Sequence, residues 1–347
     1  MMAAQSSPLT LSRIRLAVQI LMLVFTVYGG GIVGHYAAEK ITGTLPALSC
    51  AYDQQNSAYC ALIPIQHQLH HRIGDAIVKL QGVTFSVFLP LIFTLLTFLA
   101  FFIVLNKAFC GWVCPMGTIQ ELINRLGRQL DRPAQRLSGR RLDGVRAVKW
   151  GILVVLVLVL PLVAGLGLGP HAMGDAYCQI CPSRIATTLL TGDTEQMAVP
   201  ISGGWVDIVF VGFRNALFGF VVVAALAVRQ PFCRICPMLA LHALFRRVAP
   251  LRLVKIRNER CDKCGLCAKA CPMDIGEIHT SHGPKAFHED CTLCGRCAEF
   301  CPDDGVISLK FGPFPLFASG KAYFQRRSRQ EMPDGRPKRL PARAKEA

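Results

Sequence analysis

Four long apolar stretches set the pattern of the chain, at residues 16–34, 83–106, 150–168 and 208–228. Each is long enough to cross a hydrocarbon core of about 30 Å as a helix. The second and third hold no charged residue, and the fourth holds one, Arg214. The pattern therefore predicts an α-helical membrane protein with four transmembrane helices.

A shorter amphipathic pattern follows the second and the fourth stretch. Apolar residues recur there at helical spacing with arginines between them: Ile119, Leu122, Ile123 and Leu126 in the first segment, and Leu241, Leu244, Phe245 and Val248 in the second. Such basic amphipathic segments are typical of helices that lie in the membrane interface. Spans one and two thus form one hairpin and spans three and four another, which predicts an internal repeat.

Basic residues alternate between rich and poor segments. Of the 347 residues, 52% are hydrophobic, yet the formal net charge is +16. Residues 107–149 and 229–347 carry nine and twenty-two lysines and arginines, whereas residues 35–82 and 169–207 carry three and one. By the positive-inside rule, both termini are expected in the cytoplasm. The basic excess is then a topology signal, and nucleic-acid binding is not expected.

Sixteen cysteines fall into four groups of four, and two groups follow the last span. There, "CDKCGLCAKACP" and "CTLCGRCAEFCP" each show the Cys-x2-Cys-x2-Cys-x3-Cys-Pro run of bacterial [4Fe–4S] proteins. In doubled runs the fourth cysteine of each binds the other cluster. Structural zinc is the alternative, which the doubled run and its prolines disfavour. One cluster is thus assigned to Cys261, Cys264, Cys267 and Cys301, and a second to Cys291, Cys294, Cys297 and Cys271.

Two Cys-Pro pairs lie at the expected cytoplasmic face of the membrane. "FCGWVCPMG" follows the second span and "FCRICPM" follows the fourth. Their equivalent places in the repeat favour one shared four-thiolate site, a third [4Fe–4S] cluster, over unpaired reduced cysteines at helix ends. The ligands of this inner-face site would be Cys110, Cys114, Cys233 and Cys236.

The last four cysteines lie on the expected outer side. Cys50 and Cys60 follow the first span, and "YCQICPSR", with Cys178 and Cys181, follows the third. The repeat favours an outer-face metal site made of these four thiolates, a fourth [4Fe–4S] cluster. Two disulfides, Cys50–Cys60 and Cys178–Cys181, are the alternative in an oxidising compartment. Ala61 after Cys60 departs from the Cys-Pro pattern.

The same signals divide the chain into three parts. Residues 1–248 are expected to form the membrane domain with its cysteine loops, and residues 249–315 a small α+β bacterial-type ferredoxin domain with two clusters. Residues 316–347 are rich in arginine, lysine and proline, and predict a disordered basic tail.

Taken in order, "CGWVCPMGTIQEL", "YCQICPSR", "FCRICPM" and the two terminal runs resemble the membrane-bound polyferredoxins of the NapH/NosR/MauN type, over roughly residues 10–310. The resemblance implies a four-helix protein of the bacterial inner membrane with a cytoplasmic two-cluster ferredoxin domain. It also implies electron transfer between the quinone pool or a cytoplasmic donor and a respiratory or maturation partner, such as a c-type cytochrome or a periplasmic oxidoreductase.

Three functions stay open. The first is an electron carrier without bond-making chemistry of its own, in which the clusters do the redox work. The second is a quinol dehydrogenase subunit with a quinone pocket near an interfacial cysteine loop. The third is a maturation factor that reduces a metal ion or a partner's thiols through Cys178 and Cys181.

Histidines near the expected outer face raise the question of a further cofactor. Bis-histidine ligation of a b-type haem would help to carry electrons between the two faces. Interfacial or solvated histidine is the favoured interpretation, so haem b is not expected. The residues concerned are His35, His67, His70, His71 and His171.

Overall fold

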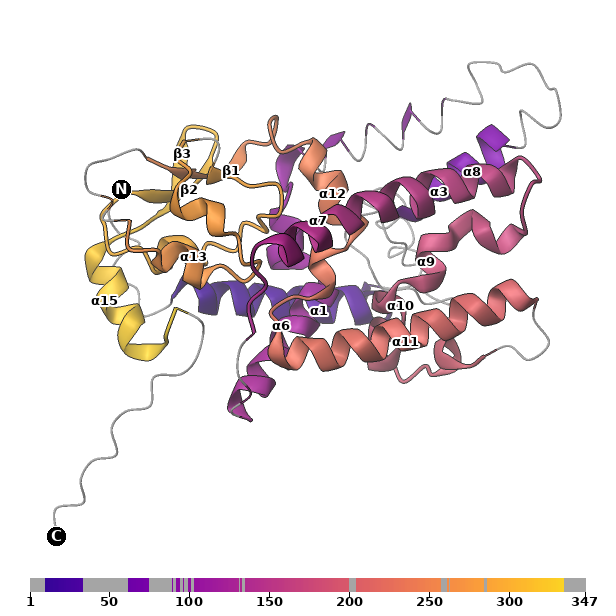
Figure 1. Ribbon diagram of the computed structural model, residues 1–347, viewed down its shortest axis with the longest axis horizontal. Helices are drawn as coiled ribbons and strands as arrows, with labels where there is room; N and C mark the ends of the chain where they lie inside the picture. The colour runs from indigo at the N-terminus through magenta and orange to yellow at the C-terminus, as the bar shows by residue number, and fades with distance from the viewer. Residues whose placement is uncertain are drawn as a thin grey trace, which may run out of the picture.

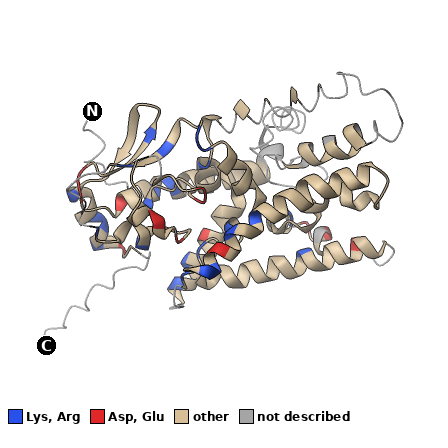
Figure 2. Cartoon of the chain, turned by 45° about the horizontal axis from the view of Figure 1, so that its top comes forward, with Lys and Arg blue, Asp and Glu red and all other residues tan. Residues whose placement is uncertain are grey.

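A computed structural model describes most of the chain. The described ranges are residues 10–33, 62–74, 103–130, 135–199, 204–256, 263–283 and 286–333, together with the separate residues 89, 92–93, 96, 99–100, 132 and 261. The molecule is elongated (Figure 1), with long helices towards one end and a small cysteine-rich domain at the other. Charged side chains gather around this domain and the adjoining helix ends, while the shafts of the long helices carry few (Figure 2).

Three long helical segments form the apolar part. They are α1 (Leu11–Val33), a continuous helix made of α7 (Arg140–Ile152), η4 (Leu153–Val159) and α8 (Leu160–Gly165), and α11 (Trp205–Ala227). Each is long and apolar enough to cross a membrane. Large apolar side chains on their outer faces are exposed, for example Phe220 and Val223 on α11, which suits contact with lipid. Most of the expected span 83–106 lies outside the described residues.

Two of these helices begin earlier than the hydropathy pattern predicts. The first begins at Leu11 instead of residue 16, and the third at Arg140 instead of residue 150. Charged residues are accepted in these early parts of the helices because they have partners: Arg15 pairs with Glu121, and Lys149 with Asp290. Hydropathy locates the apolar part of a helix, whereas these ends are stabilised by ion pairs.

Pro161 does not lie in the middle of a regular α-helix. The preceding segment η4 forms wider π-helical turns, and Pro161 follows at the start of α8. Because proline has no backbone N–H to donate, an irregular turn immediately before it accommodates the missing hydrogen bond.

The expected interfacial segments form α6 (Pro115–Gln129) and α12 (Pro237–Leu244). Each begins with a proline that directly follows a cysteine, a favourable first helical residue because its missing N–H would have no helical partner. Helix α6 exposes Leu122 and Leu126 while it buries Gln120 and Asn124. This inverts the arrangement of a soluble helix, as expected for a helix whose apolar side faces lipid.

A re-entrant segment lies between α8 and α11. It contains η5 (His171–Asp175), α9 (Ala176–Ile180), α10 (Pro182–Leu190) and η6 (Glu195–Met197). From the far end of α8 the chain turns back along the long helices, and α10 packs against α6 and α11 (Figure 1). The helical conformation satisfies the backbone hydrogen bonds of this segment, which is required of any chain buried at membrane depth. Beside it lie α3 (Leu62–His67) and η2 (Gln68–Gly74).

The C-terminal domain combines a small sheet with short helices around the cysteine runs. Strands β1 (Leu251–Lys255), β2 (Ile307–Phe311) and β3 (Phe314–Ala318) form an antiparallel sheet in that order, with Leu253 opposite Leu309 and Leu309 opposite Phe317. The helices are α13 (Leu266–Ala270), η8 (Gly276–His279) and α14 (Arg296–Glu299). This arrangement agrees with the α+β architecture expected from the two cysteine runs.

The predicted tail is ordered over its first part, so that prediction is wrong there. Residues 314–318 form β3, and α15 (Lys321–Gln330) folds back onto the domain. The hydroxyl of Tyr323 donates to Glu299 at 2.7 Å and accepts the backbone N–H of Leu11 at 2.7 Å. The prediction of disorder rested on composition, which carries no information about contacts with residues distant in the sequence. Residues 334–347 lie outside the described part.

Candidate metal centres

The two cysteine runs of the C-terminal domain have the same backbone. Lys263 and Leu293 have φ of 48° and 51°, and Gly265 and Gly295 have φ of 74° and 75°. Such left-handed positions are costly for residues with a side chain and mark functional turns. Here they curl each loop so that its amides point inward, and the N–H of Leu293 donates to Cys291 Sγ at 3.4 Å.

The folded domain brings the eight thiols together in two groups that cross between the runs. Cys271 of the first run lines one small apolar cavity with Cys291, Cys294 and Cys297 of the second. Cys301 of the second run lies within electrostatic reach of Cys267, which in turn neighbours Cys261 and Cys264. Both groups therefore have the composition that the exchange of fourth cysteines predicts.

Five of these eight thiols are buried. All cysteines that the structure describes are free thiols. Burial and the neighbouring Cys294 raise the pKa of Cys271 and of Cys291 to about 12. Clustered thiols in apolar surroundings release their protons when a cation binds. The donor set, four sulfurs in each group, fits a [4Fe–4S] cluster.

The inner-face cysteines also come together. Cys110 lies in η3 (Phe109–Val113), Cys114 directly after it, Cys233 in η7 (Phe232–Arg234), and Cys236 before α12. All four line one cavity whose other walls are mostly apolar, including Phe109, Met116, Phe232 and Leu239. Burial raises the pKa of Cys233 to about 12 and also raises those of Cys110 and Cys236 well above the usual value of a thiol. The site therefore combines four thiols with a surrounding of low dielectric constant.

Cys178 and Cys181 belong to a Cys-x-x-Cys-Pro turn. Cys181 lines the same cavity as Cys110, Cys114, Cys233 and Cys236, so this turn lies beside the inner-face site. The reason is the re-entrant segment, which carries the Cys-x-x-Cys-Pro turn between α9 and α10 back towards α6. Cys50 and Cys60 lie outside the described residues.

Tyr177 stands between the two Cys-x-x-Cys-Pro turns. Its hydroxyl lies 3.6 Å from Cys236 Sγ and 3.7 Å from Cys181 Sγ. The two turns thus share one phenol, and they are neighbours in a single buried region.

Two glutamines hold these turns in the same way. Gln120 donates to Cys233 Sγ at 3.4 Å and accepts the backbone N–H of Phe232 at 2.9 Å. Gln66 donates to Cys178 Sγ at 3.3 Å and accepts the N–H of Tyr177 at 3.2 Å. Each amide therefore joins one helix to the first cysteine of a Cys-x-x-Cys-Pro turn.

A repeated spacing in the sequence marks both glutamines. "CPMGTIQ" runs from Cys114 to Gln120, and "CALIPIQ" runs from Cys60 to Gln66 with the same spacing. The shared spacing makes Cys60 the counterpart of Cys114 in the first half of the chain. Ala61 in place of a proline had obscured this correspondence.

Both inner-face loops contact the C-terminal domain. Arg234, between Cys233 and Cys236, donates to the carbonyls of Met273 and Pro272, at 3.1 Å each, and to Asp274 at 2.7 Å. These residues directly follow Cys271 in the chain.

The other loop makes an equally direct contact. Trp112 Nε1 donates to the carbonyl of Leu293 at 2.9 Å. A Cβ added to Gly111 would lie 2.1 Å from the carbonyl oxygen of Thr292, so only glycine allows this approach. Both loops of the inner-face site thus lie against the group formed by Cys271, Cys291, Cys294 and Cys297.

Ion pairs fix the C-terminal domain in this position. Asp290, next to Cys291, binds Arg146 at 2.8 Å and also Lys149. Arg136 pairs with Asp274 at 3.0 Å. Because Asp290 and Lys149 are buried, loss of either partner would leave an uncompensated charge, which is strongly destabilising.

Four of these histidines form a cluster, in which His70 is buried and His67, His71 and His171 are exposed. His67, His70 and His71, from α3 and η2, meet His171 of η5 at the end of the long helices away from the C-terminal domain. The sequence analysis missed this because a separate segment supplies His171. His35 lies outside the described residues.

Comparisons with known proteins agree with the cysteine geometry. The family of 4Fe-4S binding domains matches the chain twice, at residues 87–133 and 212–257, and the family of 4Fe-4S dicluster domains matches residues 253–307. Each of the first two matches contains one Cys-Pro pair of the inner-face site, and the third contains both cysteine runs. No solved structure matches the chain.

Curated relatives include NosR and YccM. The "Regulatory protein NosR" of Pseudomonas aeruginosa is 33% identical over 204 residues, which are 57% of this chain and 25% of NosR. The "Putative electron transport protein YccM" of Escherichia coli is 28% identical over 186 residues, which are 52% of this chain and 45% of YccM. The uncharacterized protein MJ0750 of Methanocaldococcus jannaschii is 30% identical over half of this chain and 61% of its own length. The chain thus spans less than half of NosR and of YccM. With its apolar helices and its 4Fe–4S domains of two kinds, it is a membrane polyferredoxin-like protein homologous to NosR and YccM.

Proposed function

We propose that the protein is a membrane-bound electron carrier that passes electrons along a row of four iron–sulfur sites. The observation that carries this proposal is a series of contacts that links the described thiol groups through intervening residues. The two crossed thiol groups of the C-terminal domain are neighbours, since Cys267 of one lies close enough to Cys297 of the other to raise its pKa. The second group contacts both inner-face loops through Arg234 and Trp112. Tyr177 then joins the inner-face site to the re-entrant turn.

The proposed ligands follow the thiol groups. Two [4Fe–4S] clusters take the crossed sets of the C-terminal domain, and a third takes the inner-face set. Cys178 and Cys181 take a fourth together with Cys50 and Cys60, because Gln66 repeats the role of Gln120 and Cys60 has the spacing of Cys114. The clusters supply the one-electron chemistry, and the protein supplies thiolates, hydrogen bonds to sulfur and a low-dielectric surrounding that set the potentials.

The membrane arrangement belongs to the same proposal. Four helices in two repeated hairpins would span the inner membrane with both termini in the cytoplasm, in line with the two matches of one domain family to the two halves of the chain. A re-entrant cluster below the outer surface would shorten the distance that an electron must cross in a barrier of about 30 Å. Its acceptor or donor would be a redox protein at the outer surface, and its cytoplasmic counterpart a soluble donor or the quinone pool.

Thiol exchange by Cys178 and Cys181 has less support than cluster binding. Cys178 is 5% exposed, and its sulfur accepts a hydrogen bond from Gln66 inside the protein. A redox-active pair has to present a sulfur to its partner. Burial between helices therefore favours a ligand role.

Anaerobic purification of the whole chain tests the proposal. Four cubanes predict about sixteen irons and as many sulfides per chain, with EPR signals that change on stepwise reduction. About eight irons would restrict the clusters to the C-terminal domain and contradict the row of four. Cluster reduction by a quinol analogue would instead favour a quinol dehydrogenase subunit.

A further inference from the structure

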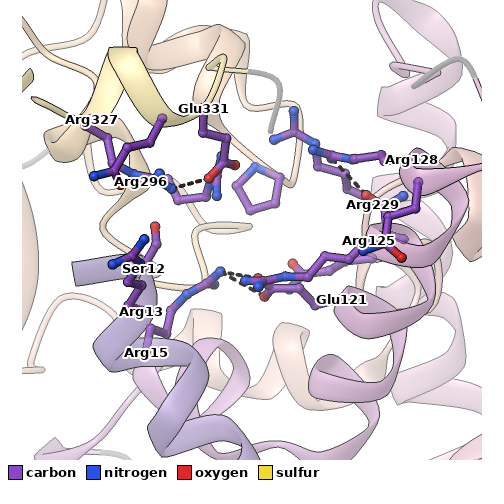
Figure 3. A pocket seen from close by; sticks show the side chains of 15 residues that line it. Ser12, Arg13, Arg15, Glu121, Arg125, Arg128, Arg229, Arg296, Arg327 and Glu331 are labelled. Carbon is purple, nitrogen blue, oxygen red and sulfur yellow. Dashed lines mark hydrogen bonds and ion pairs between the residues drawn. The ribbon is translucent and has the colours of Figure 1, made fainter. Parts of the chain in front are cut away.

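An arginine-rich pocket lies where the membrane helices meet the C-terminal domain (Figure 3). It has a volume of about 350 Å³, and its walls come from α1, α6, the end of α11, α14 and α15. Two carboxylates, Glu121 and Glu331, line it. The arginines that line it are Arg13, Arg15, Arg125, Arg128, Arg229, Arg296 and Arg327.

The two carboxylates do not neutralise these arginines. Glu121 accepts hydrogen bonds from Arg15, at 2.7 and 2.8 Å, and from Arg125 at 2.9 Å. Glu331 accepts from Arg296 at 2.8 Å and also from Arg327. Each carboxylate is therefore shared by two guanidinium groups, and the lining keeps a large positive excess.

Three of the seven arginines, Arg15, Arg296 and Arg327, are buried. Arg15 is 1% exposed, and its Nε and Nη1 have no hydrogen-bond partner among the described residues. Burial and the positive charges of Arg296 and Arg128 lower the pKa of Arg229 to about 9. The part of this shift that comes from the neighbouring arginines is repulsion between like charges, which a bound anion would offset.

We propose that this pocket binds a phosphate group, either the phosphodiester of an anionic phospholipid or a free phosphate. Guanidinium groups match phosphate oxygens with paired hydrogen bonds, and arginines prevail where phosphate is recognised. Arg125 and Arg128 belong to α6, which exposes leucines to lipid, whereas Arg296 and Arg327 belong to the C-terminal domain. A bound phosphate would thus bridge the two domains and offset the repulsion between their arginines.

The test uses the full-length holoprotein in a neutral detergent. Its unfolding temperature is measured with inorganic phosphate, with short-chain phosphatidylglycerol and with phosphatidylcholine, all at matched ionic strength. The pocket variant is Arg229→Gln, and the control is Arg329→Gln, which removes the same charge from an exposed position on α15. We expect the anion to stabilise the wild type and the control, and the pocket variant to bind at least tenfold more weakly.

The outcomes separate the two sources of phosphate. Stabilisation by phosphatidylglycerol but not by inorganic phosphate assigns the pocket to a lipid headgroup, and the reverse assigns it to a free phosphate. The proposal is overturned if neither exceeds phosphatidylcholine and sodium chloride, or if Arg229→Gln responds like the wild type. A cooperative thermal transition of Arg229→Gln without ligand shows that this variant is folded. Arg128→Gln is a second pocket variant for the same measurement.

The histidine cluster carries an independent inference. The ligand nitrogens of His70, His71 and His171 all lie within 4.8 Å of one another. The rings of His70 and His171 are 4.7 Å apart, and those of His67 and His71 are 5.6 Å apart. The cluster lines a cavity of about 720 Å³.

Glycines create the space that this arrangement needs. A Cβ at Gly174 would lie 2.2 Å from Nδ1 of His70, and one at Gly165 would lie 2.4 Å from the carbonyl oxygen of His70. Gly74 and Gly165 also approach each other too closely for a side chain on either. The backbone is thus adapted to hold His70 against η5 and α8.

We infer that His70, His71 and His171 bind a divalent first-row transition metal such as Zn²⁺ or Cu²⁺. Neutral imidazole nitrogen is a preferred ligand of both ions. Zinc–nitrogen distances are about 2.0–2.1 Å, so small side-chain rotations would bring the three nitrogens onto one ion. The adjoining cavity leaves a further coordination position accessible.

Metal binding to the holoprotein tests this inference. Co²⁺ serves as an optical probe, and the affinity for Zn²⁺ is measured by competition with a chromophoric chelator, with iron content recorded throughout. We expect His171→Asn and His71→Asn, both at exposed positions, to weaken Zn²⁺ binding at least tenfold. His279→Asn, in the C-terminal domain, is the control. Equal affinity in His171→Asn and in the control, or no stoichiometric binding by the wild type, would overturn the inference.

Discussion

The contact between Gly111 and Thr292 gives a direct test of how the C-terminal domain is coupled to the membrane domain. Substitution of Gly111 by alanine places a methyl group 2.1 Å from the carbonyl oxygen of Thr292, whereas ordinary contact begins at 3.4 Å. The two backbones must separate by about 1.3 Å, the difference between these distances. Neither partner is the end of a flexible side chain, so the strain cannot be relieved by a rotamer change.

The magnitude follows from the cost of overpacking. Extra atoms in a packed interior cost about 1–3 kcal/mol. If this cost falls on the docked state, the ratio of docked to undocked protein drops roughly 5- to 150-fold. Arg234 and the Asp290 ion pairs remain in the variant, so we expect a displaced or partly undocked domain with its own clusters intact.

EPR of the reduced holoprotein measures the effect, because magnetic coupling between neighbouring clusters weakens steeply with distance. We expect Gly111→Ala to lose coupling between the inner-face site and the adjoining cluster while iron content stays unchanged. Gly144→Ala is the matched control, since a Cβ at Gly144 meets nothing within 4 Å. Unchanged coupling and unchanged thermal stability in Gly111→Ala would refute the reasoning.

Four further substitutions test single contacts. Cys271→Ser should abolish the cluster of Cys291, Cys294 and Cys297 and spare the other cluster of the domain, as seen by iron content and EPR; loss confined to the cluster of its own run would contradict the crossed ligands. Gln120→Leu should lower the potential of the inner-face site and cost about 1–3 kcal/mol, because the buried N–H of Phe232 loses its acceptor. Gln66→Leu should act on the re-entrant site instead, and the same shift from both variants in a redox titration would exclude separate sites. Lys107→Met should lower the potentials of the inner-face site and its neighbour by tens of millivolts, with Lys107→Arg as the control, because a buried cation near Cys110 and Cys291 favours the reduced clusters; an unchanged midpoint would exclude this role.

Short-range patterns in the sequence were enough to predict the C-terminal domain. The spacing within each cysteine run implies a tight loop, because that geometry is local. The presence of two such runs then implies that their fourth cysteines are exchanged. The apolar stretches likewise predicted three of the long helices, although charged residues near the beginnings of two of them depend on distant partners such as Glu121 and Asp290.

The re-entrant segment could not be predicted in the same way. Helices α9 and α10 are too short to give a spanning signal, and few positive charges lie nearby, so the segment was interpreted as an outer loop. The histidine cluster and the arginine-rich pocket are assembled from segments far apart in the chain. Neither leaves a periodic or spaced pattern, which is why both had to be found in three dimensions.

The re-entrant segment also has a consequence for biogenesis. Cys178 is buried, and α10 packs against α6 and α11. If the site holds the proposed cluster, its loading would precede closure of the segment, while the newly inserted chain is still open. Iron supply during synthesis, instead of oxidation after export, would then decide whether the chain matures or is degraded.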